Sequence, residues 1–198
     1  MTAQEIKFFL VGDSKVGKTK LLKRFIGEFY QEEYHETTYT DSRRIEKSFN
    51  GENYLLCFWD YVGSERFKPY AKKMFLTNYN VALFVYDISN KKSFENITNW
   101  MEYCQNKAGK ISKMVLVGNK CDIEEDKRQV STDEGKKFAD DNGMLFYETS
   151  AKNNINVKAV FEENAEEISK IMKENNYQLE NDDKKIKKTK KTGCCCCH

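Results

Sequence analysis

The sequence predicts an α/β fold in which a mostly parallel sheet carries helices on both of its faces. Short apolar runs of strand length alternate with segments of helical periodicity along most of the 198-residue chain. Four of these runs are almost continuously apolar, which is typical of strands buried on both faces of a sheet. Asn50-Gly51 lies between two neighbouring runs and favours a tight hairpin, so one edge of the sheet should be antiparallel.

Six strands account for the apolar runs. They are expected at residues 6–11, 45–49, 54–59, 81–86, 114–117 and 145–147.

Four helices account for the segments between and after these strands. The first two are expected at residues 18–26 and 94–104. Ser131 and the glutamate three residues later form a capping box, which begins a third helix that runs to about residue 141. Apolar residues spaced by three or four positions place the last helix at residues 157–172.

The chain is expected to divide into a folded domain, residues 1–172, and a flexible basic tail, residues 173–198, because the apolar rhythm stops after Met172. A hydrophobic content of 39% excludes a wholly disordered chain. The sequence has no apolar run of eighteen residues that would predict a membrane-spanning helix, and the N-terminus lacks the pattern of a signal peptide. We therefore expect a cytosolic protein.

Charge is distributed unevenly along the chain. The formal net charge is +2, but six lysines between residues 184 and 191 supply much of the positive charge, and the rest of the chain carries a net charge of −4. A nucleic-acid-binding domain would carry its basic surface on the fold, so no nucleic-acid partner is expected. Cys57, Cys104 and Cys121 lack the spacing of metal ligands, whereas four more cysteines lie together at residues 194–197.

A phosphate-binding loop is predicted between the first strand and the first helix. The segment matches G-x-x-x-x-G-K-T with Gly12, Asp13, Ser14, Lys15, Val16, Gly17, Lys18 and Thr19. Backbone N–H groups of such a loop form an anion-binding nest, Lys18 would neutralise the β- and γ-phosphates, and Thr19 would bind Mg²⁺. The alternative is a chance glycine turn before a helix.

Two further motifs point to guanine as the base. In the sequence N-K-C-D, Asp122 can accept hydrogen bonds from both N1–H and the exocyclic amine of guanine, a donor pair that adenine lacks. Asn119 can bond the N7 side of the base and tie the loop together, and the stem of Lys120 can lie over the ring. After the last strand, a loop offers a backbone N–H near Ala151 to the guanine carbonyl and includes Ser150, Ala151 and Lys152.

Three more positions are candidates for the metal and the γ-phosphate. Asp60, at the end of the third strand, could hold Mg²⁺ through water, and the N–H of Gly63 could reach the γ-phosphate. Thr37, nineteen residues after Lys18, is a candidate second hydroxyl ligand of Mg²⁺. Tyr30 is assigned to the edge of the base, with an ordinary surface or core aromatic as the alternative.

Taken in order, these motifs resemble the small GTPase superfamily over about residues 5–172. E-R-F at residues 65–67, V-Y-D-I-S at residues 85–89 and the cysteine-rich end resemble its Rab branch. The resemblance implies a P-loop small GTPase fold with six strands and five helices, and two nucleotide-sensing switch loops near residues 30–43 and 60–78. It also implies a monomer that binds GTP/GDP and Mg²⁺ and directs vesicle traffic. The partners that it implies are an exchange factor, a GTPase-activating protein, effectors, a prenylation escort and a GDP-dissociation inhibitor.

The chain departs from the family pattern at several positions. Lys15 stands where these loops usually have glycine or another small residue, and Ser64 occupies the place of the glutamine that orients the attacking water. The catalytic residues that the resemblance implies are Lys18, Thr37, Gly63 and Ser64. Because Ser64 replaces the glutamine, we expect slow intrinsic hydrolysis. The alternative function is a guanine-nucleotide-dependent effector-binding module with negligible GTPase activity.

The cysteine-rich end resembles the prenylation sites of Rab proteins. The ending Cys-Cys-His favours Cys196 and Cys197 as the lipidated residues, although residues 195–198 can also be parsed as C-a-a-X. Two lipid chains give stable anchoring, and the six lysines would favour an anionic membrane surface. We therefore expect the cytoplasmic face of intracellular membranes, with a cytosolic pool. The alternative is a zinc-binding or artefactual cysteine tract.

Overall fold

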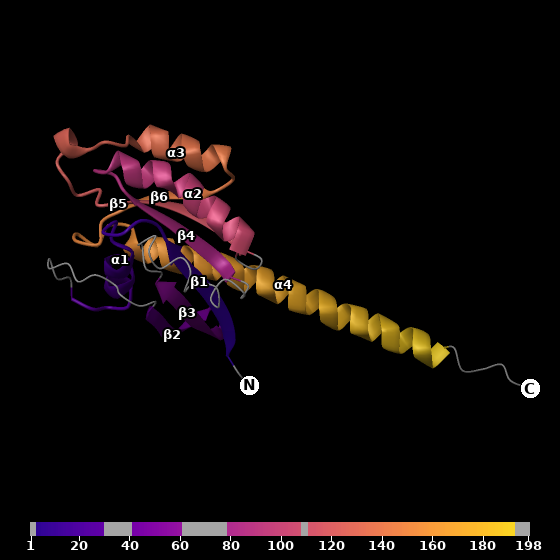
Figure 1. The fold of residues 1–198 in the computed structure, drawn as a ribbon. Coiled ribbons are helices and arrows are strands. Elements are labelled where there is room, and N and C mark those ends of the chain that lie inside the picture. The colour runs from indigo at the N-terminus through magenta and orange to yellow at the C-terminus, as the bar shows by residue number, and fades with distance from the viewer. Residues whose placement is uncertain (1–2, 30–40, 61–78, 108–110, 193–198) are drawn as a thin grey trace, which may run out of the picture.

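A computed structural model describes residues 3–29, 41–60, 79–107 and 111–192. Six strands form one sheet in the order β2-β3-β1-β4-β5-β6, and every neighbouring pair is parallel except β2 and β3 (Figure 1). The predicted fold class and its antiparallel edge are confirmed. The strands are β1 (Gln4–Val11), β2 (Asp41–Phe49), β3 (Glu52–Asp60), β4 (Tyr79–Asp87), β5 (Ile111–Asn119) and β6 (Leu145–Thr149).

The hairpin between β2 and β3 turns at the predicted pair. Asn50 has φ +51° and Gly51 has φ +78°. Two consecutive left-handed residues make a type I′ turn, which asparagine and glycine tolerate best and which matches the twist of the strands.

Helices cover both faces of the sheet. The described residues form α1 (Lys18–Phe25), α2 (Lys91–Lys107), α3 (Thr132–Asp141), α4 (Val157–Thr192) and a short 3-10 helix, η2 (Glu125–Lys127). The five helices that the resemblance implies are thus represented by four α-helices in these ranges. Ser131 caps α3 as predicted, since its hydroxyl accepts a 3.1 Å hydrogen bond from the N–H of Glu134.

Alternation along β1 separates two apolar cores. Ile6, Phe8 and Leu10 are buried with the apolar residues of α1 and α4, whereas Phe9 and Val11 are buried with those of α2 and α3. Figure 1 shows these two helix pairs on opposite sides of the sheet. A strand buried on both faces must be apolar at nearly every position, which is why β1 could be predicted from its composition.

The last helix is longer than predicted. We expected it to end at about residue 172 and a flexible segment to follow, but α4 continues to Thr192 and projects beyond the rest of the fold (Figure 1). Periodic apolar residues indicate which part of a helix packs against the sheet. They do not indicate where the helix itself ends. The added segment contains neither proline nor glycine and is rich in lysine, which favours helices even where nothing packs against it.

One edge of the sheet collects the predicted motifs. Because β1, β3, β4, β5 and β6 run parallel, their carboxyl ends meet at the same edge, and loops that follow such ends commonly form binding sites. Within the described ranges, none of the helices combines the length and the apolar character needed to cross a membrane.

Candidate functional site

The loop between β1 and α1 depends on two glycines. Gly12 has φ +144°, and a Cβ atom there would lie 2.1 Å from the carbonyl oxygen of Val85. Gly17 has φ +101°, and its Cβ would lie 2.3 Å from the side-chain nitrogen of Asn119. The loop therefore packs against β4 and β5 so closely that neither position has room for a side chain. Lys15 is also left-handed, with φ +67°, a conformation that glycine adopts at lower cost.

Lys18, the first residue of α1, is held inside this loop. Its side chain is buried, and Nζ donates 2.8 Å hydrogen bonds to the carbonyl oxygens of Gly12 and Asp13. Burial lowers the pKa of Lys18 to about 8, while the carboxylates of Asp60 and Asp13 act in the opposite direction. The ammonium is still mainly charged at neutral pH, and an anion in the loop would stabilise that charge further.

The hydroxyl of Thr19 and the carboxylate of Asp60 meet at the mouth of the loop. Thr19 Oγ1 donates a short hydrogen bond to Asp60 Oδ2, although the two residues are 41 positions apart. Asp60 ends β3 and is buried. A hydroxyl and a carboxylate are oxygen ligands of the kind that Mg²⁺ prefers, so the chemistry of this pair fits the metal. The third predicted ligand, Thr37, lies outside the described residues.

Asp13 is fastened to α2 by both carboxylate oxygens. The indole Nε1 of Trp100 donates to Oδ1 at 2.8 Å, and the side-chain amide of Asn96 donates to Oδ2 at 2.7 Å. Asp13 was predicted to contact the nucleotide. Its carboxylate is instead bonded to α2, and its backbone carbonyl oxygen accepts a hydrogen bond from Lys18. Sequence reasoning missed both partners, which are more than 80 residues away and belong to no motif.

Asn119 joins the phosphate loop to the loops that were predicted to bind the base. Its side-chain nitrogen donates to the carbonyl oxygen of Val16 at 2.8 Å, and its side-chain oxygen accepts from the Thr149 hydroxyl at 3.1 Å. Both Asn119 and Thr149 are buried. These contacts join the phosphate loop to the ends of β5 and β6.

Lys120 and Asp122 follow in the turn after β5. Lys120 has φ +69°, and its ammonium contacts the carboxylate of Asp87, the last residue of β4, at 2.5 Å. The N–H of Ile123 donates to the Lys120 carbonyl at 3.2 Å and closes the turn around Asp122. The structure thus brings Asp122 to the same edge of the sheet as the phosphate loop.

Ser150, Ala151 and Lys152 begin the loop after β6. Ser150 and Ile155 exchange two backbone hydrogen bonds of 3.1 and 3.0 Å, so the loop closes on itself. Arg24 of α1, which belongs to no predicted motif, also donates hydrogen bonds to this loop.

Comparison with known proteins now identifies the chain. Residues 7–170 match the Ras family. Ras-related protein RABE1d of Arabidopsis thaliana is 36% identical over 199 residues, which cover 96% of this chain and 92% of that protein. Ras-related protein Rab-13 of Bos taurus is 38% identical over 90% of this chain and 86% of its own length. Ras-related protein Rab-8A of Bos taurus is 40% identical, with coverages of 84% and 79%. The chain belongs to the Rab branch of the Ras family.

Membership of the Rab branch makes the chain a small GTPase whose relatives generally bind GTP or GDP with Mg²⁺. Several residues predicted for binding, catalysis or lipidation lie outside the described ranges. They are Tyr30, Thr37, Gly63, Ser64, Cys196 and Cys197.

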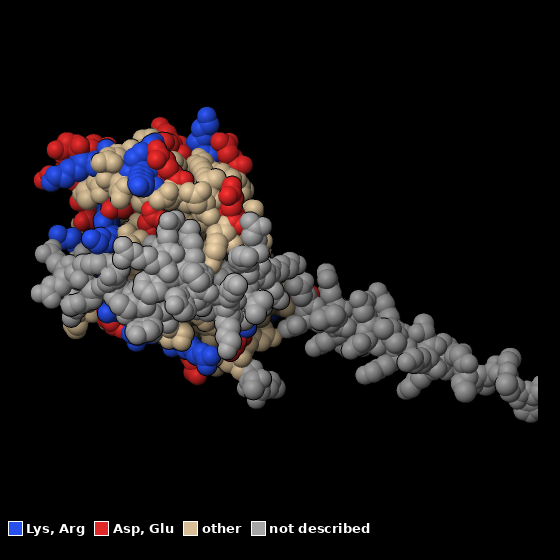
Figure 2. Space-filling model, in the orientation of Figure 1, with Lys and Arg blue, Asp and Glu red and all other residues tan. Residues whose placement is uncertain are grey.

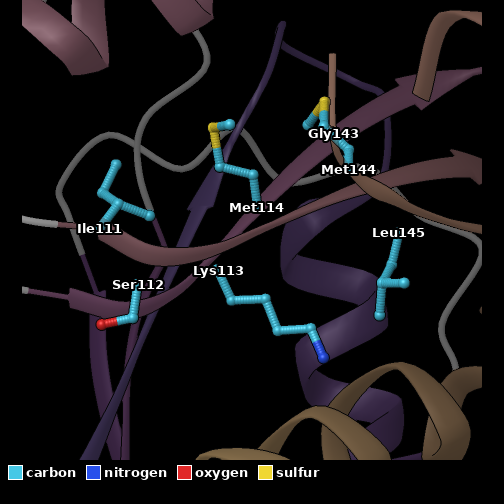
Figure 3. Close-up of a pocket in the computed structure, with 7 residues that line it drawn as sticks. All are labelled: Ile111, Ser112, Lys113, Met114, Gly143, Met144 and Leu145. Atoms are coloured by element: carbon cyan, nitrogen blue, oxygen red, sulfur yellow. The ribbon is translucent and has the colours of Figure 1, made fainter. Parts of the chain in front are cut away.

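A hollow of about 440 Å³ lies at the other edge of the sheet in this Rab-family fold. It is lined by the first residues of β5 and by residues 143–145, with Met114 and Met144 on one side and Lys113 and Leu145 on the other (Figure 3). Since β5 and β6 begin here and end at the opposite edge of the sheet, where Asn119 contacts the phosphate loop, this hollow is separate from the candidate nucleotide site.

Proposed function

We propose that this Rab-family protein is a membrane-anchored switch of vesicle traffic that binds one guanine nucleotide at the edge formed by the loops after β1, β5 and β6. The observation that carries the proposal is the pair of contacts made by Asn119. One buried side chain fixes the phosphate loop through Val16 and the base loop through Thr149, so the two halves of a nucleotide site are connected.

Each half offers the chemistry that its ligand needs. The backbone N–H groups of residues 13–19 and the ammonium of Lys18 would bind the phosphates, and Asp122 would select guanine through two accepted hydrogen bonds. Ser150 and Lys152 would support the base loop, in which the N–H of Ala151 would donate to the guanine carbonyl. Tyr30 would cover the edge of the base.

Magnesium would be held by Thr19 and Thr37, with Asp60 acting through water. When bound, the ion would neutralise charge on the β- and γ-phosphates. The hydroxyl–carboxylate hydrogen bond between Thr19 and Asp60 keeps the two side chains close, which supports a shared metal site. Thr37 and the N–H of Gly63 would respond to the γ-phosphate, so the effector-binding surface would form in the GTP state.

Hydrolysis is expected to be slow because Ser64 replaces the usual glutamine. A serine hydroxyl is too short to orient the attacking water without a further group, and a GTPase-activating protein could supply that group in trans. The second candidate function is a nucleotide-dependent binding module with negligible hydrolysis, and the same serine favours it. Single-turnover hydrolysis of preloaded GTP separates the two.

We propose that residues 1–172 form the nucleotide-binding domain and that residues 173–198 form the anchoring tail. Lipids on Cys196 and Cys197, together with six lysines, would hold the protein on the cytoplasmic face of intracellular membranes. A prenylation escort, a GDP-dissociation inhibitor and an exchange factor would then act on a monomer that cycles through a cytosolic pool. Figure 2 shows acidic and basic side chains intermingled on the visible described surface of the domain, and the lysine run belongs to the tail.

The site is tested by nucleotide binding to the full chain. We expect one fluorescent GDP per protein in the presence of Mg²⁺, displaced by unlabelled GDP or GTP but not by ATP at a hundredfold excess. Chelation of Mg²⁺ should accelerate release. Displacement by ATP at concentrations similar to those of GDP would contradict guanine selection, and a stoichiometry near zero would refute the proposed function.

A further inference from the structure

The guanidinium of Arg24 reaches from the last turn of α1 to the loop that follows β6. Nε donates a 2.9 Å hydrogen bond to the carbonyl oxygen of Ala151, and a terminal nitrogen donates a 3.0 Å bond to that of Lys152. Two consecutive carbonyls are thus bound by one fork-shaped side chain. Lysine could supply the charge but could not hold two fixed carbonyl groups with the same planar geometry.

The bonded loop is also closed by hydrogen bonds at its base. Ser150 pairs with Ile155, and the Ser150 hydroxyl accepts a 2.9 Å bond from the N–H of Asn153. Asn154 and Asn156 are both left-handed, with φ +57° and +53°. These contacts give the loop its internal shape, whereas the bonds from Arg24 join the Ala151 and Lys152 carbonyls directly to α1.

The same helix begins in the phosphate loop. Lys18 and Thr19 are the first two residues of α1, and Arg24 lies one residue before its end at Phe25. An eight-residue helix is about 12 Å long and behaves as one rigid unit. Arg24 therefore connects the segment proposed for phosphates and Mg²⁺ to the segment proposed for the guanine carbonyl.

We propose that Arg24 is a positioning residue for guanine recognition. By holding the Ala151 and Lys152 carbonyls against α1, it keeps the backbone N–H of Ala151 directed toward the oxygen on C6 of the base. The proposal rests on the proposed function, because it assumes that guanine occupies this loop. Arg24 lies outside the base-binding motifs. Its effect on affinity should depend on one atom of the nucleotide, the oxygen on C6 of the base.

The test compares GDP with 6-thio-GDP, in which sulfur replaces the C6 oxygen and accepts hydrogen bonds less well. Dissociation constants for both nucleotides are measured with the full-length parent, Arg24→Gln and Arg24→Lys. We expect the parent to prefer GDP. Arg24→Gln should weaken GDP binding about tenfold, in line with the loss of charged hydrogen bonds. It should weaken 6-thio-GDP binding less, so the preference shrinks. Arg24→Lys should fall between the other two.

Lys113→Gln is the matched control, because Lys113 of β5 pairs with Glu167 of α4 and lines the hollow at the other edge of the sheet. Its preference for GDP over 6-thio-GDP should equal that of the parent. If Arg24→Gln weakens both nucleotides by the same factor, or neither, Arg24 has no role in positioning the base loop and the inference is overturned. A parent that binds no GDP at all would instead refute the proposed function, and this inference with it.

Discussion

Trp100 holds Asp13 by a 2.8 Å hydrogen bond from its indole nitrogen to a carboxylate oxygen, and this bond fastens the phosphate loop to α2. The carbonyl oxygen of the same aspartate accepts from Lys18. A position of the loop that was predicted to contact nucleotide is thus fixed from the opposite side by a helix that carries none of the predicted site residues.

Replacing this tryptophan should loosen the loop. Trp100→Phe keeps a buried aromatic ring but removes the donor, which leaves the Asp13 carboxylate short of one hydrogen bond. We expect the free energy of unfolding to fall by about 1–3 kcal/mol and GDP to dissociate severalfold faster. Urea denaturation and stopped-flow release of a fluorescent GDP measure these effects. Tyr147→Phe is the control, since it also removes a donor to a carboxylate, that of Glu163 in α4, from a residue of no predicted motif. Equal release rates in both variants would contradict a role for the Asp13 contact.

Guanine selection should depend on Asp122. In xanthine a carbonyl replaces the exocyclic amine, so the base needs a donor where guanine needs an acceptor. Asp122→Asn should therefore bind GDP and GTP more weakly and xanthosine diphosphate more tightly than the parent. Competition binding measures the change, with Asp126→Asn as a control because Asp126 lies exposed in η2. A variant that still prefers GDP would show that another residue reads this edge of the base.

The rate of hydrolysis should respond to Ser64. Intrinsic hydrolysis by ordinary small GTPases is on the order of 10⁻⁴ per second, and we expect this protein to be slower because serine cannot orient the attacking water. Ser64→Gln should accelerate single-turnover hydrolysis of bound GTP. Ser112→Gln makes the same chemical change at the other edge of the sheet and should leave the rate as it was. An ordinary parental rate, together with no effect of Ser64→Gln, would mean that a different group positions the water.

Membrane attachment should require the last two cysteines. Replacing Cys196 and Cys197 together by serine should move the protein from the membrane fraction to the soluble fraction of eukaryotic cells. The intact mass of the parent should include two isoprenoid groups. Changing Cys194 and Cys195 instead provides a matched control and should preserve attachment. Membrane-bound protein with an unmodified end would overturn the assignment, and stoichiometric zinc would support the alternative metal-binding tract.

The sheet could be predicted from sequence because burial leaves a local record. A strand such as β1, covered on both faces, is apolar at consecutive positions, and Asn50-Gly51 carries the turn preference of the hairpin in two residues. The phosphate loop is similarly local, since Gly12 and Gly17 are required by close approach of backbone and side chains. Such features need only a few neighbouring residues to be recognised.

Contacts between distant segments left no such record. The bonds from Trp100 to Asp13 and from Arg24 to Ala151 join residues 87 and 127 positions apart, and neither donor belongs to a recognisable motif. The end of α4 was missed for a different reason, because helix propensity can continue after the apolar face that reveals a packed helix has stopped. Fold and motifs were therefore accessible from sequence, whereas the supports of the candidate site required the structure.

The length of α4 changes how the domain would stand on a surface. Lys173 anchors the helix to the hairpin, with Nζ 3.0 Å from the Asn50 carbonyl oxygen and 3.1 Å from the Glu52 carboxylate. Beyond this anchor the helix runs on for roughly 30 Å at 1.5 Å per residue. A flexible chain of the same number of residues would let the domain reorient freely relative to a membrane that held its end. A helix fixed at the hairpin is a rigid spacer. An attachment at its far end would therefore set the distance and the orientation of the nucleotide-binding loops relative to the surface.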